Sequence, residues 1–96
     1  MPAALLREKT TDEQGNIREL VIWRVEPNPR QPDGIRYRLA LVLAGEKIPA
    51  VLYDNHHPKG HHRHIKEREE SYRFVDARQL VADFLADASR LAGAVK

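Results

Sequence analysis

All five histidines of this chain lie between His56 and His64, with lysine and arginine side chains among and directly after them. Histidine titrates near neutral pH, so one imidazole can accept a proton while a neighbouring one donates a proton. His62 and His64 are two residues apart, so on an extended segment they point to the same side, with Cα atoms about 6–7 Å apart. This pair is our candidate for general acid–base chemistry.

Cationic side chains lie beside the pair and suit an anionic substrate. Lys59 and Arg63 can hold a phosphate group and stabilise negative charge that develops on it, while Asp54 can orient an imidazole ring. These groups suit metal-independent cleavage of RNA, in which one group takes the proton of the ribose 2′-hydroxyl and another protonates the leaving 5′-oxygen. We expect the catalytic set to be His62, His64, Arg63, Lys59 and Asp54.

A second set of residues is expected to extend the contacts with the substrate. It comprises Arg68, Arg73, Tyr72, Arg36 and Arg38. Arg36 and Arg38 alternate along one predicted strand and can form a track for phosphates, although a solvent-facing edge is the commoner explanation of such arginines. Packing within a strand is the commoner role of a tyrosine such as Tyr72.

Two other interpretations of the histidines stay open. In the first, His62 and His64 bind a metal with His57 or Asp54 as third ligand, although the sequence has no specific zinc signature. In the second, the stretch is a solvated loop without catalytic chemistry, which contacts nucleic acid or an acidic partner. The acid–base interpretation needs no metal and no cofactor, and we expect neither. Whether the protein is an enzyme is left open between these interpretations.

Composition and length limit the class of protein. Ninety-six residues suffice for one domain with a single small core. The absence of cysteine excludes disulfides, thiol catalysis and cysteine-based zinc sites. A net charge of +2 favours a local cationic patch over a strongly basic domain. No signal peptide is recognisable and no apolar run approaches the roughly 20 residues that span a bilayer, so we expect a cytoplasmic protein without membrane contact.

Four segments before the histidines are expected to be strands, namely 3–11, 17–25, 36–44 and 47–54. The first two flank a turn-rich spacer of the hairpin type, the second is rich in β-branched and aromatic residues, and the last two alternate between apolar and polar side chains. Trp23 falls in the apolar alternation of the second segment, so we expect it in the core. Pro49 places the fourth strand at an edge of the sheet or introduces a bulge. We expect residues 55–70 to form a His/Arg-rich loop and 71–74 to form a short final strand.

A single helix is predicted over residues 77–91. Asp76 is a candidate N-cap with Gln79 three residues later, and Gly93 is a candidate stop. The apolar residues follow helical spacing, at Leu80, Val81, Phe84, Leu85, Ala88 and Leu91. The expected fold is therefore α+β, an antiparallel sheet of four to five strands with one C-terminal helix packed on a face.

The order of short motifs resembles that of the TumE family, the toxin components of bacterial toxin–antitoxin pairs. The motifs in this chain are Tyr53-Asp54-Asn55, Lys59-Gly60-His61-His62-Arg63-His64, Glu70-Ser71-Tyr72-Arg73-Phe74 and Leu80-Val81-Ala82-Asp83-Phe84. Two earlier segments also resemble sequences of the family, Leu5-Leu6-Arg7-Glu8-Lys9 and Val21-Ile22-Trp23-Arg24-Val25. The resemblance covers nearly the whole chain. Two positions depart from it, because the family often has Asp where this chain has His61 and Pro where it has Ser71.

The resemblance implies a small cytosolic toxin that is neutralised by a separate antitoxin with a helix-turn-helix DNA-binding domain. Its motif points first to Lys59, His62, Arg63 and His64 as functional residues, and after them to Asp54 and Tyr72. It does not imply a mechanism, so cleavage of RNA rests on the residue types and on analogy with toxins that attack translation. RNA is accordingly the expected substrate, and the oligomeric state, a homodimer included, stays open.

Overall fold

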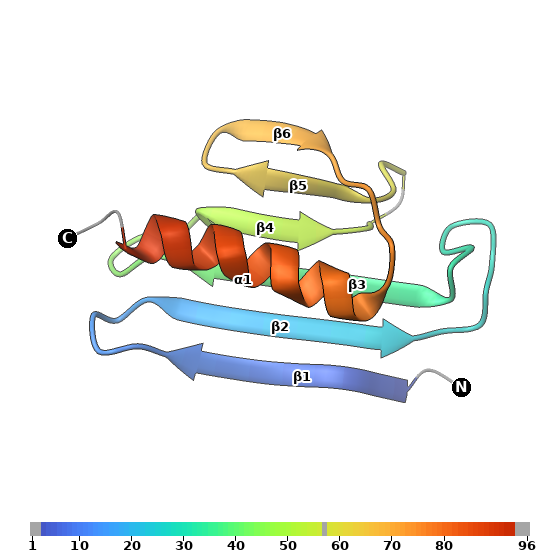
Figure 1. Cartoon of the computed structure of the whole chain (residues 1–96), viewed down its shortest axis with the longest axis horizontal. Helices are drawn as coiled ribbons and strands as arrows, with labels where there is room; N and C mark the ends of the chain where they lie inside the picture. Colours follow the sequence, from blue (N-terminus) through green and yellow to red (C-terminus); the bar gives the residue numbers. More distant parts are fainter. Residues whose placement is uncertain (1–2, 57, 94–96) are drawn as a thin grey trace.

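The computed structural model describes residues 3–56 and 58–93, which form one antiparallel sheet with one helix against it (Figure 1). The six described strands follow each other through the sheet in the order of the sequence. They are β1 (Ala3–Thr11), β2 (Ile17–Arg24), β3 (Ile35–Val42), β4 (Val51–Asp54), β5 (His62–Ile65) and β6 (Arg68–Ser71), and the helix is α1 (Ala77–Gly93). The expected α+β class is confirmed, with six strands in place of four to five.

The turn between β1 and β2 is built by polar side chains. The Asp12 carboxylate accepts hydrogen bonds from the backbone and the side chain of Asn16, both at 2.9 Å. Gly15 adopts a φ of 89° there, a conformation that favours glycine. The buried Asn16 side chain also accepts the Ala44 N–H at 2.8 Å. One amide therefore joins this turn to the connection that follows β3.

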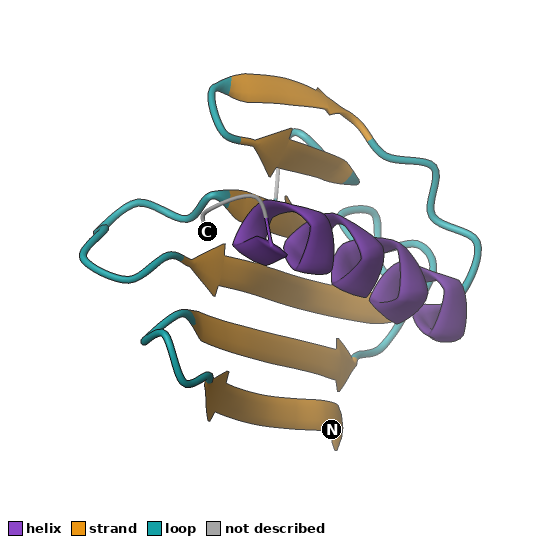
Figure 2. Ribbon diagram, turned by 60° about the vertical axis from the view of Figure 1, so that its left-hand side comes forward, coloured by secondary structure: helices purple, strands orange, loops and turns teal. Residues whose placement is uncertain are grey.

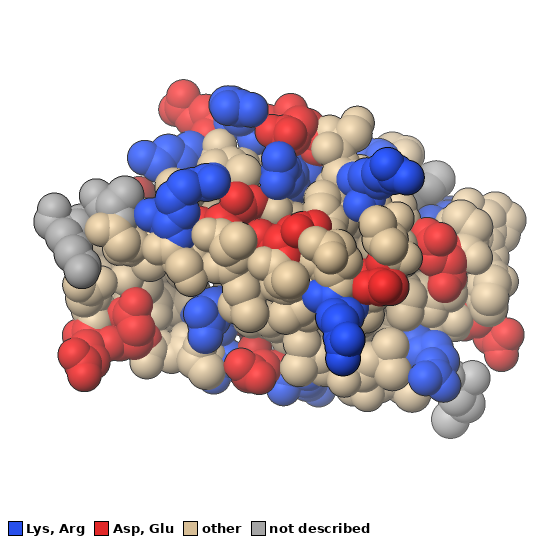
Figure 3. All heavy atoms as spheres, viewed as in Figure 1, with Lys and Arg blue, Asp and Glu red and all other residues tan. Residues whose placement is uncertain are grey.

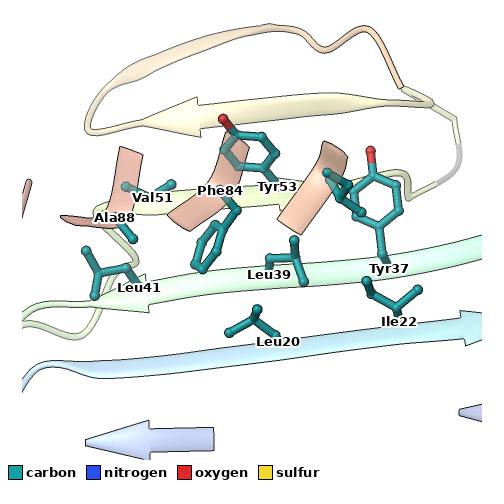
Figure 4. Packing of buried hydrophobic residues seen from close by; sticks show 10 residues of the cluster. Leu20, Ile22, Tyr37, Leu39, Leu41, Val51, Tyr53, Phe84 and Ala88 are labelled. Carbon is teal, nitrogen blue, oxygen red and sulfur yellow. The ribbon is translucent and has the colours of Figure 1, made fainter. Parts of the chain in front are cut away.

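The core lies between the sheet and the helix (Figure 4). Period-two alternation sends one set of strand side chains toward α1, where they are buried: Leu20, Ile22, Tyr37, Leu39, Leu41, Val51 and Tyr53. The helix contributes Leu80, Phe84 and Ala88 at helical spacing. Burial of these apolar surfaces is the main stabilising contribution to the fold.

The helix begins where the sequence predicts. Asp76 Oδ1 accepts the Gln79 N–H at 2.8 Å, which confirms Asp76 as the N-cap. The Gln79 side chain donates to Asp83 at 2.7 Å, so the hydrogen bond back to the cap that completes a capping box is replaced by one along the helix. None of the described helices is long and apolar enough to cross a membrane.

Figure 2 shows the helix lying on one side of the sheet. No described helix covers the other side, which we call the open face. The open face carries the alternate residues of each strand, and the site described below lies on it.

The expected loop over residues 55–70 is wrong, because it contains β5 and β6. Polar side chains of the two strands contact each other across their hairpin. Arg63 forms an ion pair with Glu70, and His64 Nε2 lies 3.2 Å from Glu69. Lys66 takes a φ of 56° in the turn between them, a conformation uncommon outside glycine. Polar strands that pair through their charges lack the apolar alternation by which strands are predicted.

Three further expectations are also corrected. The last strand ends at Ser71, so 71–74 is not a separate strand. Pro49 lies before β4, which begins only at Val51 and is interior, between β3 and β5. Trp23 lies half-buried outside the buried core. Its β2 neighbour Ile22 faces the helix, so Trp23 faces the open side.

Candidate functional site

The alternation of β5 divides the histidine-rich stretch between the two faces of the sheet. Asp54 of β4 pairs with His62, and Leu52 pairs with His64, so both histidines lie on the open face beside Asp54. Their ring centroids are 5.3 Å apart in a T-shaped arrangement. Arg63, between them in sequence, points to the helix face. The structure thus brings His62, His64 and Asp54 together and separates Arg63 from them.

His62 lies between two hydrogen-bond acceptors. Its side chain is 10% exposed, with Nδ1 at 2.7 Å from the Gly60 carbonyl oxygen and Nε2 at 2.9 Å from Asp54 Oδ1. A carbonyl oxygen only accepts, so Nδ1 carries a proton. When Nε2 is protonated too, both N–H groups donate and the imidazolium forms an ion pair with Asp54. His62 and Asp54 together can therefore hold a proton of the kind that a general acid supplies.

Glu69 forms the second half of the site. Its Oε2 atom lies 3.2 Å from His64 Nε2 and 2.6 Å from Lys59 Nζ. The hydrogen bond from Lys59 is the main cause that lowers the pKa of the Glu69 carboxyl. His64 is 32% exposed, and donation of its Nε2–H to Glu69 leaves the Nδ1 lone pair free to accept a proton. His64 is thus the more accessible of the two imidazoles.

The same cluster has the donor atoms of a metal site. One atom each from His62, His64 and Glu69 lie within 4.8 Å of one another. Imidazole nitrogen and carboxylate oxygen are both ligands of Zn²⁺. A cation would have to displace the Lys59 ammonium from Glu69. His57, an alternative third ligand in the sequence interpretation, lies outside the described residues.

Arg63 belongs to a polar network on the helix face. Its Nη2 lies 3.1 Å from Glu70 Oε2, and its Nη1 donates to the Tyr53 hydroxyl at 3.0 Å and to Asp87 at 3.2 Å. The Tyr53 hydroxyl in turn donates to Asp87 on α1. Burial first, and then the hydrogen bond to Asp87, raise the pKa of Tyr53 to about 12. The network joins β4, β5 and β6 to the helix, which is a structural role.

Most of the expected substrate contacts also lie away from the histidine pair. Tyr72 donates to Asp83 of the helix at 2.5 Å, and burial raises the pKa of its hydroxyl. Arg68 pairs with Glu70, and Arg73 is exposed in the connection to α1. Figure 3 shows basic and acidic side chains interspersed on this helix side, without a concentrated cationic patch.

Arg36 and Arg38 of β3 lie instead on the open face, where both are exposed. Arg38 pairs in register with Asp54 of β4, and Asp54 pairs with His62 of β5. Arg38, Asp54 and His62 therefore form one row across the sheet. Of the second expected set, these two arginines share the open face with the histidine site.

The remaining motif residues hold the site in place. His61 stacks on Phe74 with ring centroids 4.8 Å apart, and its nitrogens lie 2.9 Å from the Tyr37 hydroxyl and 2.8 Å from Asp33. The buried Asn55 accepts the Tyr37 N–H at 3.0 Å and so extends the pairing between β3 and β4. Asn55 thus fixes the segment directly after β4, and His61 fixes the segment directly before β5.

The sequence did not point to Glu69 as a site residue, because Glu67, Glu69 and Glu70 form a charged run of the kind that is usually exposed to solvent. The one available signal was a turn at Lys66–Glu67: folding the chain back there pairs Glu69 with His64. Trp23 was missed as an open-face residue, because both faces of β2 carry apolar side chains.

The site belongs to a chain that matches a known family over nearly its whole length. The family model described as Toxin TumE matches residues 4–92. Comparisons with curated proteins and with solved structures gave no match. The match includes all six described strands apart from the first residue of β1, the histidine site, and all of α1 except its last residue. The resemblance seen in the motifs is confirmed: this chain belongs to the TumE toxin family.

Proposed function

We propose that this toxin cleaves RNA, with His64 as general base and His62 as general acid. The observation that carries the proposal is that two imidazoles lie side by side on the open face with different hydrogen-bonding environments. His64 can donate Nε2–H to Glu69 and keep the Nδ1 lone pair free, whereas both nitrogens of His62 face acceptors, the Gly60 carbonyl and Asp54. Histidines of differing protonation are what transfer of a phosphodiester to a neighbouring hydroxyl requires.

The proposed reaction proceeds by attack of the ribose on its own phosphate. His64 Nδ1 takes the proton of the 2′-hydroxyl, and the 2′-oxygen forms a bond to phosphorus. The bond from phosphorus to the 5′-oxygen of the next nucleotide breaks, and the proton held between His62 and Asp54 passes to that oxygen. The products are a 2′,3′-cyclic phosphate and a free 5′-hydroxyl.

Other residues of the open face supply positive charge for the phosphate. Lys59 lies at Glu69 and is 57% exposed, so it can turn toward a bound phosphate. Arg38 lies in the same row as His62 and extends the cationic side chains along the sheet. Arg63, which the sequence placed on the phosphate, serves in this proposal as the structural link to the helix.

Purified wild type, His62→Ala, His64→Ala and the double variant would be assayed on a labelled single-stranded RNA. General acid–base groups contribute about 10² to 10⁴ in rate, so each single variant should lose at least about 100-fold. Arg90→Gln is the control, since Arg90 lies on the helix away from the open face and its side chain is 62% exposed. Thermal unfolding would show that each variant is folded.

The same variants would be induced in bacteria, with soluble protein levels compared. Wild type and Arg90→Gln should arrest growth, and the double histidine variant should not. A double variant that still cleaves RNA and arrests growth would remove the proposal. If wild type binds RNA without cleaving it, the protein is instead a non-catalytic binding module.

A second candidate, a His-ligated metal protein, is favoured by the convergence of His62, His64 and Glu69. It predicts that wild type binds Zn²⁺ in a calorimetric titration and that Glu69→Gln weakens this binding. It also predicts that a chelator abolishes cleavage. The acid–base mechanism predicts cleavage that a chelator leaves unchanged, which separates the two candidates in one experiment.

Membership of a toxin family implies a cognate antitoxin. We propose, from the resemblance, that this antitoxin carries a helix-turn-helix domain, and that the toxin acts on cytoplasmic RNA. Addition of the purified antitoxin should stop RNA cleavage. Sedimentation of the toxin with and without it would show whether the toxin forms the homodimer that the sequence left open.

A further inference from the structure

We propose that the open face binds single-stranded RNA, with Trp23 as a stacking platform for a base and Arg36 and Arg38 as phosphate contacts. The inference deepens the proposed function, on which it rests for the identity of the ligand. It adds a binding groove next to the histidine site and gives Trp23 a role in recognition.

The groove lies over β2 and β3 and has a volume of about 730 Å³. Its lining residues include Val21 and Trp23 from β2, Arg36 and Arg38 from β3, and Asp54 from β4. Asp54 also holds His62 at 2.9 Å. The groove and the histidine site therefore share a side chain, and a ligand in the groove reaches the histidines without leaving the open face.

Trp23 is not required by the core. The β2 side chains that pack under the helix are Leu20 and Ile22, which are 3% and 1% exposed. Trp23 is only half-buried, and the alternation of β2 places it on the opposite face. No described helix covers that face of the sheet (Figure 2). A flat aromatic surface on an open sheet stacks on any nucleic-acid base, since every base has a π-face.

The charges around Trp23 fit a phosphate backbone. Arg36 is its direct neighbour across the β2–β3 ladder, and Arg38 is the neighbour of Val21. Arg30 lines the same groove. Arg38 is paired with Glu19 only at 3.9 Å, and both side chains are about half exposed. That weak surface pair can open for a phosphate at little cost.

The spacing connects this platform to the reaction centre. Trp23 and His62 are three strands apart and two residues apart along the strand direction. A strand spacing of about 4.8 Å and a rise of about 3.3 Å per residue place their Cα atoms about 16 Å apart. An extended strand of a few nucleotides covers that distance, so one base can stack on Trp23 while a neighbouring phosphate lies at His62.

Because the chain has a single tryptophan, its fluorescence reports on this groove alone. The probe is a short single-stranded oligonucleotide with 2′-O-methyl riboses, which lack the nucleophilic hydroxyl and cannot be cleaved by the proposed route. We expect it to quench Trp23 emission on binding. A duplex of the same sequence should quench much less, because its bases are already stacked.

Affinity would be measured by anisotropy of a dye on the oligonucleotide. Trp23→Ala should weaken binding about 5- to 150-fold, the usual loss when one stacked base loses its aromatic partner, and Trp23→Phe should restore most of it. Arg36→Gln should reduce the slope of log affinity against log salt by about 1. Arg24→Gln is the matched control on β2, because Arg24 points to the other face of the sheet.

The outcomes separate this proposal from the proposed reaction. Suppose that the oligonucleotide quenches Trp23 and binds less tightly to Trp23→Ala, but wild type does not cleave ordinary RNA. That result supports the groove and contradicts the proposed chemistry. Cleavage that is unaffected by Trp23→Ala supports the chemistry and overturns the groove. Emission that responds to the antitoxin but not to the oligonucleotide also overturns it, since the face would then be a protein interface.

Discussion

Replacement of Asp87 by alanine should test whether the Arg63 network is structural. Asp87 is buried, although it lies on the helix and is charged. It accepts hydrogen bonds from the Tyr53 hydroxyl, from Arg63 at 3.2 Å and from Arg90 at 2.9 Å. Asp87→Ala leaves the Tyr53 hydroxyl and the Arg63 guanidinium without this acceptor at the boundary between sheet and helix.

The expected loss of stability follows from these contacts. Loss of one partner in a buried ion pair costs about 3–5 kcal/mol, and the partial exposure of Arg63 reduces this to the low end of the range. We therefore expect the free energy of unfolding to fall by about 3 kcal/mol. For a domain of this size, that corresponds to a decrease of about 12–24 °C in Tm.

The assay is thermal and urea unfolding followed by circular dichroism. Arg90→Ala is the control, because the Arg90 side chain is 62% exposed and should contribute less than about 0.5 kcal/mol. A double-mutant cycle of Asp87→Ala with Arg63→Ala should give a coupling of about 1–3 kcal/mol. If Asp87→Ala unfolds within about 0.5 kcal/mol of wild type, or the coupling is zero, Arg63 is free for another role and the structural assignment fails.

Two further predictions concern stability. Hydrogen bonds from Lys59 and Arg63 lower the pKa of Glu69 and Glu70, so both contribute stability above an unfolded pKa of about 4.3 and lose it as pH falls through their folded pKa. Stability should therefore decline below about pH 4.5, and less steeply in Glu69→Gln/Glu70→Gln, as urea titrations at several pH values would show. Asn16→Ala should cost about 2 kcal/mol, measured in the same way, because it leaves the Ala44 N–H without its acceptor.

Each of these has an outcome that contradicts it. A double glutamine variant with the same pH dependence as wild type would show that other groups account for the acid sensitivity. For Asn16, the control is Gln14→Ala in the same turn, which should change stability little because Gln14 is exposed. Equal effects of the two substitutions would contradict the bridging role of Asn16.

The sequence determined the elements whose signals are local. Apolar alternation predicted β3, β-branched and aromatic residues predicted β2, and the turn-rich spacer before β2 placed β1 next to it. Helical spacing with Asp76 as cap predicted α1 to within two residues at its end. The spacing of His62 and His64 also placed both on one side of a strand, because successive side chains of a strand alternate whatever the sheet around it. Motif order was sufficient to indicate the family, which the match over residues 4–92 confirms.

Only the tertiary structure decided which charged residues lie together. β5 and β6 were missed because polar side chains contact each other across the two strands. Strands of this kind lack the apolar alternation from which strands are predicted. Arg63 is adjacent to His62 in sequence, yet it lies on the opposite face with Asp87, from a helix that follows much later. Trp23 looked like a core residue because hydrophobicity does not reveal which face of a sheet the helix covers. The residues and their spacing set the available chemistry, and α1, by covering one face of the sheet, determined which of them stay exposed for that chemistry.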